Sequence, residues 1–155
     1  MKIPKYTLEI DENKSPLLVT EEYQYFENSH IKTTKDAVDF AEMGFRLSRK
    51  AEEHLVMIAT VSGCVTALFS VTHGTYNFAQ FSPREIFIRL LLSGAGEFIL
   101  LHNHPGASID ISREDELACR RMKDAANLMG MKLLDFIIVS SDGTNYCSFA
   151  DENLL

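Results

Sequence analysis

A strand–helix–strand order in the C-terminal half of the chain constrains the fold most. Residues 97–101 and 133–139 are mostly apolar segments of strand length. Between them, residues 112–129 carry apolar side chains every three or four positions, which is the period of an amphipathic helix. A strand, a helix and a second strand in this order form a crossover unit of an α/β sheet. The order therefore predicts helices packed against a sheet.

The rest of the chain supplies further elements of the same two kinds. Helical spacing predicts helices over residues 33–51 and 82–94, and the Ser82-Pro83 pair is typical of a helix start. Ser62-Gly63 predicts a tight hairpin turn. Residues 11–29, which hold Pro16 and several acidic side chains, are expected to be irregular. The remaining expected strands are residues 6–10, 55–61, 65–72 and 146–149. Together these elements predict an α/β, three-layer-like sandwich of a mixed β-sheet with flanking helices.

Length, charge and cysteine content limit the classes of protein to which the chain can belong. A chain of 155 residues is the size of one domain with its own core. The formal net charge of −7 argues against broad binding to nucleic acid phosphates. No apolar run approaches the roughly 20 residues of a membrane span, and no signal-peptide pattern follows Met1. Cys64, Cys119 and Cys147 are widely separated, which predicts reduced thiols in a cytoplasmic protein.

The residues best suited to catalysis or metal binding follow the strand at residues 97–101. His102 and His104 are two positions apart, so in an extended segment both imidazoles project to one side. Asp115 lies one turn inside the next predicted helix, and its carboxylate can point back at the two histidines. Two imidazoles and a carboxylate can hold Zn²⁺ and leave a coordination position open for water. The spacing therefore indicates a catalytic zinc site.

A purely structural interpretation of the same residues stays open. Ser112 followed three residues later by Asp115 is also an ordinary helix-capping sequence. A single His-x-His pair is a weak motif when it stands alone. The metal hypothesis depends on the combination of His102, His104, Ser112 and Asp115 within fourteen residues. The two interpretations are compatible, because a capping serine and its aspartate can also face an ion.

This combination resembles the JAMM motif of the JAB/MPN metalloprotease family, and the residues around it resemble the bacterial RadC branch. The motif reads His-x-His-Pro, six residues, Ser, two residues, Asp, beginning at His102. Flanking matches occur at residues 74–77, 82–85 and 133–139, so that the resemblance covers about residues 35–155. It implies a JAB/MPN fold of the cytidine-deaminase-like type in a single domain, with residues 1–33 as an N-terminal extension. We expect no helix-hairpin-helix domain, which fuller members carry, within these 155 residues.

The resemblance also assigns roles to individual residues. It implies that His102, His104 and Asp115 bind Zn²⁺ and that Ser112 helps to hold the oxyanion or the attacking water. The family also uses a glutamate from an earlier strand as general base. Counting back from residue 74 places this glutamate at Glu52, and a slip of one residue would place it at Glu53.

Three functions follow from this resemblance. The first is a zinc-dependent hydrolase that cleaves an amide bond in a peptide or isopeptide-linked protein substrate. The second is a non-catalytic scaffold or binding domain, and the third is an accessory role in DNA repair, as the RadC label suggests. An unpaired edge strand could support a homodimer. The complete ligand set favours the hydrolase, and the acidic charge weighs against the DNA role.

Overall fold

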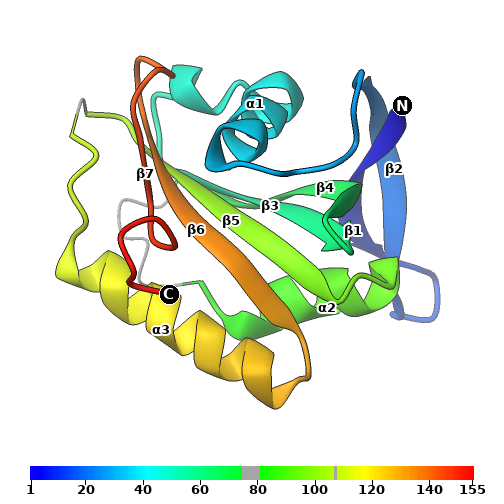
Figure 1. Cartoon of the computed structure of the whole chain (residues 1–155). Helices are drawn as coiled ribbons and strands as arrows, with labels where there is room; N and C mark the ends of the chain where they lie inside the picture. Colours follow the sequence, from blue (N-terminus) through cyan, green and yellow to red (C-terminus); the bar gives the residue numbers. More distant parts are fainter. Residues whose placement is uncertain (75–80, 107) are drawn as a thin grey trace.

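The computed structural model describes residues 1–74, 81–106 and 108–155, and shows one sheet covered by helices on both faces (Figure 1). Residues 75–77, which contribute to the sequence resemblance, lie outside the described residues. The described strands are β1 (Lys2–Ile10), β2 (Pro16–Tyr25), β3 (His54–Val61), β4 (Cys64–His73), β5 (Glu97–His104), β6 (Lys132–Ser140) and β7 (Tyr146–Ser148). The described helices are α1 (Thr34–Phe45), the short 3-10 helix η1 (Leu47–Arg49), α2 (Pro83–Ser93) and α3 (Arg113–Leu128). None of these helices is long and apolar enough to cross a membrane.

The sheet is mixed, and its strand order is β2-β1-β4-β3-β5-β6-β7. Helix α1 covers one face, and α2 and α3 cover the other (Figure 1). Alternation along β5 shows the two faces clearly, because Phe98 and Leu100 pack in the α2–α3 core while Ile99 and Leu101 pack in the α1 core. The predicted α/β sandwich is confirmed.

Strand β5 lies between an antiparallel neighbour, β3, and a parallel neighbour, β6. The segment that leads into β3 therefore lies beside the carboxyl end of β5, and α3 begins after the loop that leaves the same end. The carboxyl end of a strand in an α/β sheet is a common place for a binding site. Three separate parts of the chain thus meet at this end of β5.

The prediction of an irregular segment over residues 11–29 was wrong for most of its length. Strand β2 occupies ten of these residues and pairs antiparallel with β1, which itself pairs in parallel with β4. Pro16 is the first residue of β2, where proline removes no internal hydrogen bond of the sheet. The acidic residues Glu21 and Glu22 are exposed on an edge strand, where charge is tolerated and discourages further pairing.

Two predicted boundaries also moved. Helix α1 ends at Phe45 instead of near residue 51, because Arg46 adopts a left-handed conformation with φ of 52° and the short helix η1 follows. Strand β5 continues through His104, so that both histidines lie in the strand and not in the loop after it. The Ser62-Gly63 hairpin turn is confirmed, with φ of 52° and 74° at the two residues.

Candidate metal centre

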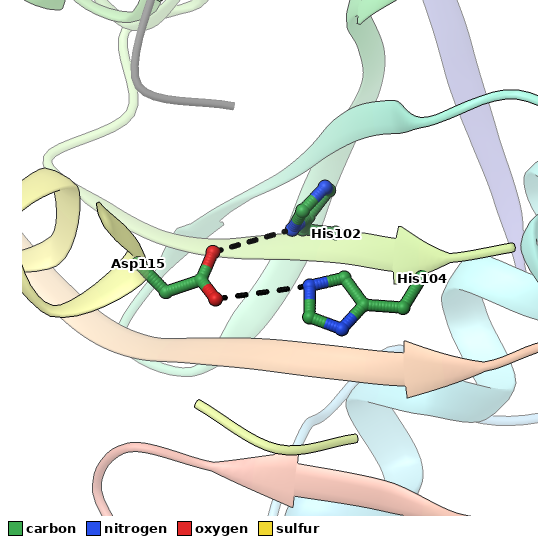
Figure 2. A group of neighbouring side chains, drawn as sticks. All are labelled: His102, His104 and Asp115. Carbon is green, nitrogen blue, oxygen red and sulfur yellow. Dashed lines mark ion pairs between the residues drawn. The ribbon is translucent and has the colours of Figure 1, made fainter. Parts of the chain in front are cut away.

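Two histidines of β5 and one aspartate of α3 converge to form a His–His–Asp cluster of His102, His104 and Asp115 (Figure 2). Asp115 Oδ1 lies 3.7 Å from His102 Nδ1, and Asp115 Oδ2 lies 3.7 Å from His104 Nε2. One potential ligand atom from each residue lies within 4.8 Å of the other two. The structure therefore brings together the three residues that the sequence indicated as metal ligands.

The start of α3 determines the direction of the Asp115 carboxylate. Ser112 is the N-cap residue, and its Oγ accepts a hydrogen bond from Asp115 N at 3.1 Å. Asp115 Oδ2 accepts in return from Ser112 N at 3.0 Å and from Ser112 Oγ at 2.6 Å. These reciprocal bonds form a capping box, as the structural interpretation of the sequence predicted. The same bonds hold the carboxylate against the two histidines, so the capping and metal interpretations apply together.

Burial and hydrogen bonding act differently on the two histidines. Burial, with a smaller effect of the neighbouring His104, lowers the pKa of His102 to about 3, so its imidazole is neutral at physiological pH. His104 Nδ1 lies 3.1 Å from the carbonyl oxygen of Ser108. A carbonyl oxygen only accepts, so Nδ1 carries a proton, which leaves Nε2 as the nitrogen of this ring that can bind a metal. Metal binding therefore does not require removal of a proton from the His102 ring near neutral pH.

The donor set fits a zinc ion. Two neutral imidazoles and one carboxylate are ligands that zinc accepts, and three protein ligands leave the open position of a catalytic site. Glu53 adds a second observation, because its Oε2 atom is buried and has no hydrogen-bond partner among the described residues. A buried carboxylate oxygen without a partner is costly and is frequently explained by an ion, a water or a functional role.

The structure places Glu53, and not Glu52, beside the cluster. Glu53 Oε2 lies 3.4 Å from His102 Nε2. The carboxylate of Glu52 lies instead against Gly74, where an added Cβ would stand 3.0 Å from Glu52 Oε2. The physical reason is the register of β3, in which Leu55 lies opposite His102 and Glu53 is two residues earlier on the same face. The geometry therefore supports the alternative assignment at Glu53.

The environment of Glu53 suits a base. Burial raises the pKa of its carboxyl, and the nearby Asp115 charge adds to the effect while His104 opposes it. A carboxylate with a raised pKa is a better proton acceptor near neutral pH. A cavity of about 550 Å³ opens beside it. The residues that line this cavity are Ala51, Glu52, Glu53, Gly74, His104, Pro105, Gly106 and Ser108. A substrate in the cavity would contact both Glu53 and His104.

Asn103 is a buried residue of the site to which the sequence analysis gave no role. Its side-chain amide forms hydrogen bonds with the segment that carries Glu52 and Glu53. The only sequence signal was a polar amide between two histidines at the end of an apolar strand, and that signal does not indicate a partner.

The low pKa of His102 leads to a prediction for the metal-free protein. Below its ordinary pKa of 6.5, the histidine takes up a proton in the unfolded chain but stays neutral in the folded one. The free energy of unfolding therefore falls as the pH falls from 6.5 toward 5, by up to about 1.4 kcal/mol per pH unit from this group. Urea unfolding at several pH values, with chelator present, should show that the free energy of unfolding falls more steeply with decreasing pH in the parent than in His102→Gln. The matched control is His30→Gln, because His30 is exposed. Equal slopes of unfolding free energy against pH in the parent and in His102→Gln would contradict the low pKa of His102.

Comparison with known proteins agrees with this geometry. The model of the RadC-like JAB domain matches residues 31–154. A UPF0758 protein of Clostridium acetobutylicum is 32% identical over 133 residues, covering 86% of this chain and 57% of the relative. A UPF0758 protein of Trichlorobacter lovleyi is 35% identical over 117 residues, covering 76% of this chain and 50% of the relative. The chain thus spans about half the length of the curated relatives that it matches.

Proposed function

The chain belongs to the RadC-like JAB domain family, and from that membership we propose that it is a zinc-dependent hydrolase of amide bonds. His102, His104 and Asp115 are the proposed zinc ligands, and Glu53 is the proposed general base. The observation that carries the proposal is the meeting of three proposed ligand side chains with the buried Oε2 atom of Glu53, which lies 3.4 Å from His102 Nε2 and forms no hydrogen bond among the described residues. A scaffold that had lost its chemistry would have no need to bury such a group.

A zinc ion bound by His102, His104 and Asp115 would supply Lewis acidity and would lower the pKa of water enough for water to act as a nucleophile near neutral pH. The Glu53 carboxylate accepts a proton from the attacking water and then delivers it to the nitrogen of the leaving amine. Ser112 is proposed to stabilise the oxyanion, exchanging the bond that its hydroxyl donates to Asp115 Oδ2 for one to the substrate. No covalent intermediate with the protein is needed.

The proposed substrate is a protein or peptide whose scissile amide enters the cavity beside Glu53 and His104. Both a main-chain peptide bond and a lysine isopeptide bond satisfy this chemistry, since each presents one carbonyl and one leaving amine. The hydrolysis experiment described next decides between the peptide bond and the isopeptide bond.

The proposal is tested by metal analysis together with hydrolysis. The purified protein should contain about one zinc per chain. It should cleave an internally quenched peptide library or a matched probe with a lysine ε-amide link, lose this activity after chelation and regain it with added zinc. Activity that survives complete removal of metal would contradict the proposal. Failure to take up zinc at all would favour the scaffold hypothesis.

A further inference from the structure

We propose that Asn103 is a positioning residue that fixes Glu53 relative to the metal ligands, an inference that rests on the proposed function of the site. Asn103 stands between His102 and His104 on β5, and consecutive residues of a strand project to opposite faces. The two histidines therefore project toward α3, and Asn103 projects toward the α1 face, where its neighbours Ile99 and Leu101 pack. The Asn103 side chain is 1% exposed.

The Asn103 amide forms three hydrogen bonds with the segment that leads into β3. Its Oδ1 atom accepts from the His54 amide nitrogen at 2.7 Å. Its Nδ2 group donates to the carbonyl oxygen of Glu52 at 3.0 Å and to that of Lys50 at 3.4 Å. The backbone pairing between β3 and β5 ends at Leu55 and His102, so the side chain continues the connection where the ladder stops.

These bonds hold the backbone on both sides of Glu53. The Glu52 carbonyl belongs to the peptide unit before Glu53, and the His54 amide belongs to the unit after it. The carbonyl oxygen of Glu53 itself accepts from Gly74 N at 3.0 Å. With both peptide units held, the backbone dihedral angles of Glu53 are fixed, and with them the direction of the Cα–Cβ bond from which its carboxylate reaches toward His102.

Only a primary amide of this length fits the three partners. It offers one acceptor for the His54 amide and two donors for the two carbonyl groups. An aspartate of the same shape keeps the acceptor but places a negative oxygen against carbonyl oxygens. Alanine or serine would leave buried backbone groups without partners. The strand that carries the metal ligands thereby also sets the position of the base.

The first test uses the metal-free protein and needs no substrate. Hydrogen exchange of the His54 amide, monitored by nuclear magnetic resonance, should become about tenfold faster or more in Asn103→Ala and in the milder Asn103→Ser. Crystal structures of both variants should show the Glu53 carboxylate displaced from His102. Unchanged exchange and an unmoved carboxylate would overturn the proposal. Thr60→Val is the matched control, since Thr60 is a buried polar residue at the opposite end of β3.

The second test is a double-mutant cycle on the zinc-loaded protein. It uses the internally quenched peptides and the probe with a lysine ε-amide link as substrates. Asn103→Ala should bind zinc with the parent stoichiometry and lower kcat by about 10- to 100-fold, with KM nearly unchanged. In a Glu53→Gln background the same change should cost almost nothing, because the base has already been removed. An equal loss of kcat in both backgrounds would show that Asn103 acts through something other than Glu53.

The two tests separate this inference from the proposed function. A parent protein that binds zinc but cleaves neither probe contradicts the hydrolase proposal, while amide exchange and the crystal structures still decide whether Asn103 holds Glu53. A parent that cleaves the probes, with Asn103→Ala equally active, overturns the inference alone.

Discussion

We expect Glu53→Gln to keep its zinc and to lose about 10²- to 10⁴-fold in kcat on a cleaved amide probe. The substitution preserves the size of the side chain and its place beside His102 but removes the ability to accept a proton. Stability should stay equal or rise. Burial raises the pKa of the Glu53 carboxyl, so its charged form is disfavoured in the folded state at neutral pH. Zinc content, steady-state kinetics and thermal unfolding of the same preparation measure all three outcomes.

Glu52→Gln is the matched control, because it makes the same chemical change one residue away. The Glu52 carboxylate lies against Gly74 and not against the His–His–Asp cluster. Glu52 lines the same cavity, so its replacement is expected to change KM more than kcat, and kcat should stay within about threefold of the parent because the Glu52 carboxylate lies away from the His–His–Asp cluster. A large loss in Glu52→Gln together with full activity in Glu53→Gln would reverse the assignment.

The choice between these two glutamates shows what the sequence could not determine. Residues 55–59 are apolar at every position and are buried on both faces, so their pattern does not reveal which residues point toward α3. The face is defined only by the pairing of Leu55 with His102, two residues 47 positions apart in the sequence. A slip of one residue exchanges the faces, and no local signal prevents it.

The His–His–Asp cluster and the architecture were easier to predict because their signals are local. His102 and His104 are separated by the two-residue period of a strand, and Ser112 and Asp115 by the three-residue spacing of a helix cap. Strand β2 was missed for the opposite reason. Its proline and glutamates resemble loop residues locally, and they are acceptable only because tertiary pairing with β1 leaves β2 at the edge of the sheet.

We expect His104→Ala to abolish tight zinc binding while the chain stays folded. It removes one of the three proposed ligands. Even the substitution of a residue that only hydrogen-bonds to a metal ligand lowers metal affinity by about 10- to 100-fold. The loss of zinc affinity in His104→Ala should therefore exceed about 100-fold. His104 is at the last position of β5 and is only partly buried, so the free energy of unfolding of the metal-free protein should change by less than about 1 kcal/mol. Competition with a chromophoric chelator measures zinc affinity, and urea unfolding measures stability.

His30→Ala is the control, since His30 is exposed and does not belong to the His–His–Asp cluster. It should bind zinc as tightly as the parent. The hydrogen bond between His104 Nδ1 and the Ser108 carbonyl holds the ring with Nε2 toward Asp115, so the ring needs little rearrangement to bind a metal. Zinc affinity in His104→Ala equal to that of the parent would mean that the ion binds elsewhere, and it would remove the basis for assigning hydrolysis to this site.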